Sequence, residues 1–169
     1  MEQHMQPMID KIIVPIDFSD ASEHAARYAA RLSRRLYASV HLIHVLEEVP
    51  VSPGPLEFYA GESPDVREER YQCARRRLNA LAESVATCAT RVTTEVRSGA
   101  IAESIGKAVL DYGADLVIMS THGRTGLSHL LMGSVAEKVI QTARCPVLAI
   151  RDCGQVHTHL PQVESSRVA

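Results

Sequence analysis

The sequence predicts an α/β protein built on a single open, doubly wound, parallel five-stranded sheet with four helices. Two observations support this fold class. Short runs rich in β-branched residues alternate along the chain with amphipathic stretches whose apolar residues recur at helical spacing. Strands and helices in strict alternation also require parallel pairing, because each helix must carry the chain back across the sheet in a right-handed crossover.

The individual elements follow from these patterns. The expected strands are Lys11–Ile16, Ser39–Leu46, Arg91–Arg97, Asp115–Ser120 and Pro146–Arg151. The expected helices are Ala21–Leu36, Val66–Val85, Ile101–Tyr112 and Val135–Ala143. Capping-box spacings at Asp20-x-x-Glu23 and Ser134-x-x-Glu137 predict two helix starts, and Gly113 stands where a helix-ending glycine belongs. The last strand is short, apolar and followed by a polar segment, so we expect it at an edge of the sheet.

The chain divides into one domain and two flanking segments. We expect the domain over residues 10–151, an N-terminal extension over 1–9 and a mobile C-terminal tail over 152–169, which shows no periodicity. The connection Glu47–Asp65 contains four prolines and two glycines. Loops of this length are functional lids or disordered segments, and the sequence leaves both alternatives open.

Charge and composition argue against several classes of partner. The formal net charge is −2 and the sequence pI is about 6.4, so the chain lacks the positive field that nucleic-acid binding requires. No apolar stretch approaches the ~20 residues of a membrane span, and the first residues lack the apolar core of a signal peptide. Four cysteines without a CxxC pair fit reduced thiols. We therefore expect a cytoplasmic protein without nucleic-acid or membrane partners.

A glycine-bearing segment, Ser120–Ser134, joins the fourth expected strand to the last expected helix. Glycines allow a close approach of the backbone, and the free N–H groups at a helix start attract anions, so such a segment can cradle phosphate. Its spacing is neither GxxxxGK[ST] nor GxGxxG. From these residues alone, a phosphate cradle and an ordinary strand-to-helix turn capped by Ser134 both remain open.

Two segments resemble the signatures of a known family. KIIVPIDFSDA at Lys11–Ala21 resembles the N-terminal signature of the universal stress protein family, and Ser120–Ile150 resembles its C-terminal signature. The resemblance implies the strand order 3-2-1-4-5 of the adenine nucleotide alpha hydrolase-like folds. It also implies an ATP or AMP site and a homodimer in which the last strands of the two subunits pair. The implied function is a dimeric, adenine-nucleotide-binding sensor or regulator of the stress response.

The resemblance also assigns the nucleotide contacts to the ends of three strands. Around the phosphates and ribose it implies Gly123, Gly133, Ser134 and Val135, and at the family's first glycine position this chain has Ser120. Arg124 is the only cation in this segment other than histidine, and it could reach a phosphate.

The first two strands supply the remaining candidates. Pro15 would form a wall of the adenine site, and the backbone of Val45 would pair with the adenine edge. Asp17 could accept hydrogen bonds from the ribose hydroxyls, help the phosphates to hold Mg²⁺, or cap the turn into the first helix. With the implied strand order, Asp17 and the glycine segment flank the point where the order reverses, which is where open α/β sheets bind ligands.

Other functions compete with the sensor. One is a non-nucleotide-binding, dimeric interaction module of the same family, and another is a slow ATP hydrolase. Rapid phosphoryl transfer requires a cationic clamp, a metal-holding side chain and a water-positioning group, and only Asp17, Arg124 and Ser134 could serve. An ATP-pyrophosphatase-like enzyme ranks last, because no glycine-rich loop follows the first strand. For the run Arg75–Arg77, the sequence favours a solvated helix face over a binding patch.

Overall fold

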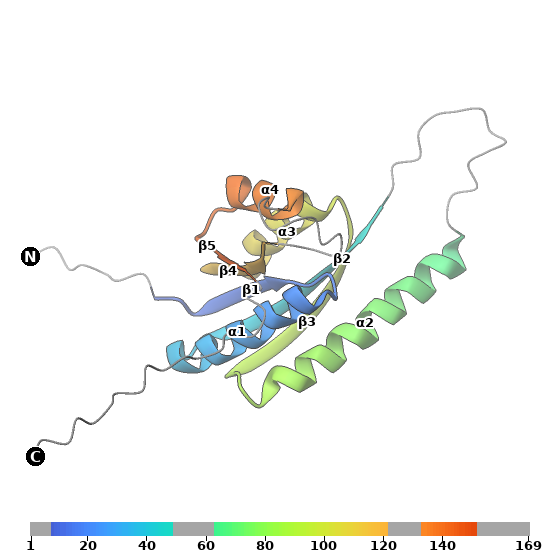
Figure 1. Cartoon of the computed structure of the whole chain (residues 1–169). Helices are drawn as coiled ribbons and strands as arrows, with labels where there is room; N and C mark the ends of the chain where they lie inside the picture. The colour runs from blue at the N-terminus through green and yellow to red at the C-terminus, as the bar shows by residue number, and fades with distance from the viewer. Residues whose placement is uncertain (1–7, 49–62, 122–132, 152–169) are drawn as a thin grey trace, which may run out of the picture.

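A computed structural model describes residues 8–48, 63–121 and 133–151, and the structural statements below concern these residues. They form one parallel sheet with helices on both faces (Figure 1). The strands are β1 (Lys11–Pro15), β2 (Ser39–Glu47), β3 (Arg91–Gly99), β4 (Leu116–Ser120) and β5 (Val147–Ile150). Their order is β3-β2-β1-β4-β5, which confirms the predicted fold class and strand order. It also confirms β5 as an edge strand.

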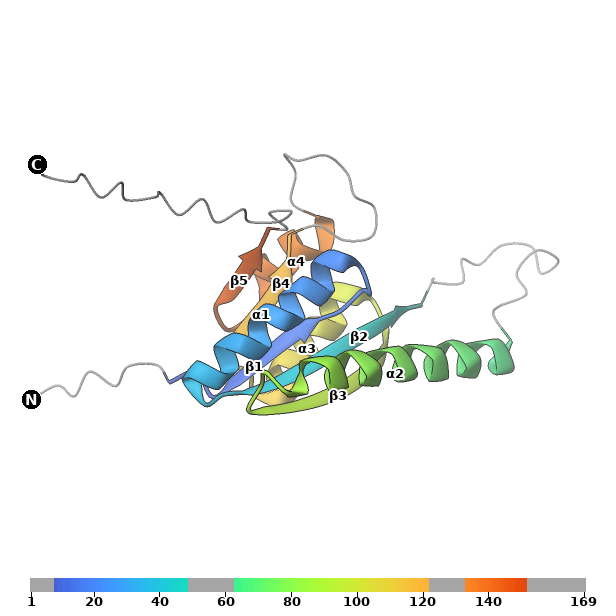
Figure 2. The same cartoon turned by 60° about the horizontal axis from the view of Figure 1, so that its bottom comes forward.

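Four helices cover the sheet in two pairs. They are α1 (Asp20–Leu36), α2 (Pro64–Ala86), α3 (Ile101–Tyr112) and α4 (Ser134–Thr142). The pair α1 and α2 packs on one face and the pair α3 and α4 on the other (Figures 1 and 2). The N-terminal part of α2 continues beyond the end of β2 (Figure 2). No described helix is both long and apolar enough to cross a membrane.

The two faces of the sheet bury two separate cores. In β1, Ile12 and Val14 pack toward α1 and α2, whereas Ile13 between them packs toward α3 and α4. All three side chains are fully buried. A central parallel strand must be apolar on both faces, and this explains its continuous hydrophobic run.

Two helix starts differ by one residue from the predicted capping boxes. The N-cap of α1 is Ser19, whose Oγ accepts a hydrogen bond from the N–H of Ser22, and Asp20 is the first helical residue. The N-cap of α4 is Gly133, which offers no side chain, and Ser134 is its first helical residue. Both capping-box predictions were therefore wrong, because the extended backbone that a cap requires occurs one residue earlier. Gly113 ends α3 with φ 65°, as predicted.

Candidate functional site

A cavity of about 640 Å³ opens at the carboxyl ends of β1, β2 and β4. Consecutive connections leave β1 and β4 on opposite faces of the sheet, toward α1 and α4, so the cavity lies at the reversal of the strand order. This is the position at which open α/β sheets bind ligands, and the volume is typical of small-molecule sites.

The structure brings together every predicted site residue that it describes. Those lining the cavity are Pro15, Asp17, Val45, Ser120, Gly133, Ser134 and Val135. The remaining two, Gly123 and Arg124, lie outside the described residues. Residues from three strand ends and one helix start, far apart in the sequence, thus share one cavity.

Asp17 shapes the turn that leads from β1 into α1. Its Oδ1 accepts hydrogen bonds from the N–H of Ser19 at 3.0 Å and from the hydroxyl of Ser19 at 2.6 Å. Ser19 in turn caps α1. Of the roles that the sequence left open for Asp17, a role in this turn is therefore confirmed, and the same residue also lines the cavity.

Phe18 occupies an unusual position between a histidine and an arginine. Its backbone is left-handed, with φ 62°, which is rare for a bulky residue. The ring lies 4.5 Å from the ring of His44, centroid to centroid, and the guanidinium carbon of Arg77 lies 4.1 Å from the Phe18 centroid. His44 is fixed because its Nδ1 donates a hydrogen bond to the carbonyl of Ile16 at 2.6 Å. These three side chains line the cavity on its α2 side.

The sequence analysis missed Phe18 and Arg77 as cavity residues. Arg75, Arg76 and Arg77 are all exposed, as the solvated-face interpretation expects, but only Arg77 lines the cavity. Three consecutive residues cannot share one face of a helix. Arg77 lies next to the buried Leu78 and three residues after the buried Ala74, and this position beside the apolar stripe is the signal that could have identified it.

Gly133 lets two backbones approach each other closely. Its N–H donates to the carbonyl of Thr121 at 2.8 Å, and a Cβ at this position would lie 3.3 Å from the same oxygen. The φ of Gly133 is −62°, which any residue can adopt, so space rather than backbone freedom explains the glycine. The contact holds the start of α4 beside the end of β4.

The start of α4 offers amide groups to the cavity. Ser134, Val135 and Ala136 line the cavity and are the first three residues of the helix. The first N–H groups of a helix have no partner within it, and together with the helix dipole they favour an anion. No side chain of a described residue caps this end.

The face of the cavity near α3 is apolar. It is lined by Ile43, Val45, Ile101, Ile105 and Met119. Two carboxylates, Asp17 and Glu47, also line the cavity. The described residues contain no group of three or more His, Cys, Asp or Glu side chains placed to hold a metal ion. The described part of the site thus combines an apolar wall, anion-favouring amides and isolated carboxylates, which suits an organic anion.

Comparisons with known proteins identify the class. The family model described as the universal stress protein family matches residues 8–151. Universal stress protein MJ0531 of Methanocaldococcus jannaschii is 35% identical over 141 residues, which is 83% of this chain and 81% of that protein. The chain belongs to the universal stress protein family.

Solved structures agree with this assignment. The structure of MJ0577 of the same organism has 27% sequence identity and a TM-score of 0.71, covering 85% of this chain and 96% of that one. A universal stress protein from Archaeoglobus fulgidus, solved in complex with dAMP, has 21% identity and a TM-score of 0.60. It covers 85% of this chain and 98% of that one, and at this identity it supports the fold alone.

Proposed function

We propose that this protein binds an adenine nucleotide, ATP or AMP, in the cavity and acts as a dimeric stress-response sensor or regulator. The observation that supports this function best is the convergence of Pro15, Asp17, Val45, Ser120 and the Gly133–Val135 segment on one cavity at the sheet's reversal point. The sequence motifs predict each of these residues as a nucleotide contact. Adenine is proposed as the base because a protein of the same fold has been solved in complex with dAMP.

Each part of a nucleotide has a matching surface in the cavity. The base packs against the apolar wall near α3, with Pro15 beside it and the backbone of Val45 at its edge. The ribose hydroxyls lie near the Asp17 carboxylate. The phosphates lie at the start of α4, where the amides of Ser134 and Val135 and the helix dipole favour negative charge. Gly123 and Arg124 belong to the same proposal.

Magnesium fits this site only when phosphates of the bound nucleotide supply some of its ligands. Mg²⁺ is usually bound through one or two carboxylates plus substrate phosphates and water. Among the described lining residues, Asp17 is the carboxylate at the end of β1, and its Oδ1 already accepts two hydrogen bonds from Ser19. When bound, the ion would neutralise phosphate charge, and Asp17 would contribute at most one ligand.

The dimer is proposed through β5, the edge strand. Leu148 of β5 is 37% exposed, and the outer edge of the strand pairs with no other described strand. Exposed edges of this kind pair readily with a second strand. The cytoplasm is the proposed location, as the composition indicates.

The test is calorimetric titration with ATP, ADP and AMP, with and without Mg²⁺. The variant Ser134→Pro removes both the hydroxyl and the N–H at the first position of α4. Proline is well tolerated there, and Gly133 before it has ψ 143°, which suits a residue preceding proline. The chain already uses this arrangement at Pro64, the first residue of α2. The Ser134→Pro variant should therefore fold.

We expect saturable nucleotide binding by the wild-type protein and binding about tenfold weaker in Ser134→Pro, a loss of about 1.4 kcal/mol. The matched variant Ser134→Ala keeps the N–H and should retain most of the affinity. Thermal denaturation of all three proteins checks the fold. No binding of any adenine nucleotide by folded wild-type protein would reject the sensor and favour the interaction module, with the Ser120 side chain in the cavity as its cause. Phosphate release during the titration would instead support the slow hydrolase.

A further inference from the structure

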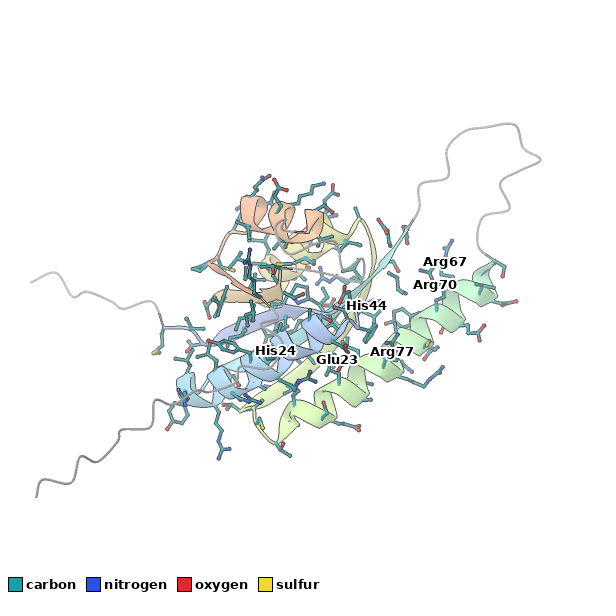
Figure 3. All side chains as sticks on the ribbon, in the orientation of Figure 1. Glu23, His24, His44, Arg67, Arg70 and Arg77 are labelled. Atoms are coloured by element: carbon teal, nitrogen blue, oxygen red, sulfur yellow. The ribbon has the colours of Figure 1, made fainter. Side chains whose placement is uncertain are left out.

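Part of the cavity lining is not used by the proposed nucleotide contacts. This part comes from α2, through Arg70, Cys73, Ala74 and Arg77, and from Phe18. Figure 3 shows Arg77 and His44 close together between α2 and the sheet, and Arg70 further along α2. We call this part of the cavity the α2 compartment. It is the only part of the described lining that contains arginine.

Arg77 presents a guanidinium suited to an anion. Its guanidinium carbon lies over the face of Phe18, 4.1 Å from the ring centroid, and Arg77 forms no salt bridge with a described residue. A guanidinium stacked on an aromatic ring keeps its N–H groups in its own plane, where they can bind a phosphate or carboxylate by two parallel hydrogen bonds. Stacking also restricts the side chain, so less conformational entropy is lost when an anion binds.

The Phe18 ring is held in place despite a backbone cost. A left-handed backbone costs a residue with a Cβ about 1–2 kcal/mol. The Asp17–Ser19 turn and the stack of His44, Phe18 and Arg77 maintain this conformation. Conformations of this kind persist where the surroundings over-determine them, and they cluster at ligand sites. The Phe18 ring is therefore kept beside Arg77 in the α2 compartment.

The α2 compartment and the start of α4 lie on opposite sides of the sheet edge. Helix α2 packs on the face that α1 covers, whereas α4 packs on the face that α3 covers. We therefore do not assign the phosphate at the start of α4 to Arg77, although both line the same cavity. Asp17, which precedes Phe18 directly, lies at the same strand end as the α2 compartment. In the proposed arrangement the ribose lies near Asp17, so a group attached to the ribose is the one that we assign to Arg77.

We propose that the α2 compartment binds a second anionic group, carried on the ribose of an adenine nucleotide, and that Arg77 is the residue that selects for it. The inference rests on the proposed function. The ligand class is an adenosine 3′,5′-bisphosphate, in which the 5′-phosphate binds at α4, the 2′-hydroxyl donates to Asp17 and the 3′-phosphate binds to Arg77. Because the Asp17 carboxylate repels a nearby phosphate, the site favours this ligand only while Arg77 is present.

Titration calorimetry with AMP, ADP and adenosine 3′,5′-bisphosphate tests this proposal. For the wild-type protein we expect the bisphosphate to bind about tenfold more tightly than AMP. In Arg77→Ala the order should reverse, with the bisphosphate weaker than AMP, because the repulsion by Asp17 is no longer offset. The affinities for AMP and ADP should change by less than about twofold, since neither ligand reaches the α2 compartment.

Arg76→Ala is the matched control. It removes the same charge from the adjacent residue of the same helix, which is exposed and does not line the cavity, so the preference for bisphosphate should remain. Equal affinity of the wild-type protein for AMP and bisphosphate would overturn the inference and leave the proposed function standing. Retention of the preference in Arg77→Ala, or an equal loss for all three ligands, would also overturn it. Failure of the wild-type protein to bind any of the three would reject the proposed function and this inference with it.

Discussion

The two ends of the sheet use polar residues in opposite ways. At the amino ends of the strands, Asp115 Oδ2 accepts hydrogen bonds from the N–H groups of Asp10 and Lys11, each at 3.0 Å. The Lys11 ammonium donates to the carbonyl of Tyr112, also at 3.0 Å. At the carboxyl ends, Asp17, Ser134 and the first amides of α4 line a cavity instead. Polar groups at the amino ends of the strands hydrogen-bond within the protein, whereas those at the carboxyl ends also line a cavity.

Helix α1 connects these two ends and has a left-handed aromatic residue at each. Phe18, with φ 62°, precedes its start and is held by two ring contacts in the cavity. Tyr37, with φ 58°, caps its end and is 86% exposed. The cost of a left-handed backbone is thus offset at Phe18 by its ring contacts in the cavity. At Tyr37, which is exposed, little offsets the same cost. Substitutions at the amino ends of the strands should therefore change stability, and substitutions at the carboxyl ends should mainly change nucleotide binding.

The largest expected effect is on stability, at the amino end. Asp115→Ala leaves two backbone N–H groups without their carboxylate and should lower the free energy of unfolding by about 2 kcal/mol. Nucleotide affinity should be unchanged, because Asp115 does not line the cavity. Urea denaturation and calorimetry measure the two quantities.

A surface carboxylate of α2 provides the control for Asp115. Glu83 is exposed, and Glu83→Ala should change the free energy of unfolding by less than about 0.5 kcal/mol. Asp115→Asn keeps one acceptor oxygen and should fall between the two. If Asp115→Ala weakened nucleotide binding as much as it lowered stability, the division between the two ends of the sheet would be wrong.

At the carboxyl end the opposite result is expected for Asp17→Asn. The amide oxygen can still accept from Ser19, so the turn and the cap of α1 should survive. Loss of the negative charge weakens the hydrogen bonds from ribose hydroxyls, and AMP should bind about tenfold more weakly, or about 1.4 kcal/mol. The free energy of unfolding should change by less than about 0.5 kcal/mol. A stability loss with unaltered affinity would make Asp17 a purely structural residue.

Glycine substitution of Phe18 and Tyr37, the two aromatic residues with a left-handed backbone, gives the next largest effect. Tyr37→Gly removes the backbone cost at an exposed cap and should raise the free energy of unfolding by about 1 kcal/mol. Phe18→Gly gains the same backbone term but loses the contacts with His44 and Arg77, each worth about 1 kcal/mol, so its net effect is a destabilisation. Thermal denaturation of both variants measures the difference. Equal stabilisation would mean that the stack around Phe18 contributes nothing.

Most of the fold could be predicted from the sequence, because periodicity reports burial directly. The apolar run around Ile12–Val14 faces two cores, and the spacing of Ala25 and Ala29 faces one. The first residues of the helices were harder to predict from the sequence. Ser19 and Asp20 are both good caps by residue type, and the backbone conformation that selects Ser19 depends on its hydrogen bonds with Asp17.

The candidate site was predictable only where a motif marks it. Pro15, Asp17 and the Gly133–Val135 segment lie within the two family signatures, and the structure places them in one cavity. No motif marks Arg77, because its place in the cavity depends on how α2 packs on the sheet and on its contact with Phe18, which is distant in the sequence. Residues brought to a site by helix packing rather than by a strand end require the tertiary structure.

The smallest expected effect comes from a polar cluster that belongs to neither end of the sheet. Glu95 of β3 lies 2.7 Å from the Nε of Arg97 and 3.0 Å from the Nε2 of His41. Burial opposes ionisation of Glu95, but the hydrogen bonds from Arg97 and His41 and their charges outweigh it, so the pKa of Glu95 lies below its ordinary value of 4.5. This carboxylate is satisfied within the protein, like Asp115, and should affect stability alone.

Because the pKa of Glu95 is lower in the folded protein than in the unfolded chain, its ionised form stabilises the fold above pH 4.5 and that contribution is lost as the pH falls through the folded pKa. Urea denaturation between pH 6 and pH 3 measures it. Glu95→Gln should reduce the stability lost over this range by about 0.5 kcal/mol, since a side chain 35% exposed is screened by solvent. Its nucleotide affinity at pH 7 should match that of the wild-type protein. An unchanged pH dependence would place the acid sensitivity of the fold in other carboxylates, and a change in affinity would extend the site beyond the carboxyl ends of the strands.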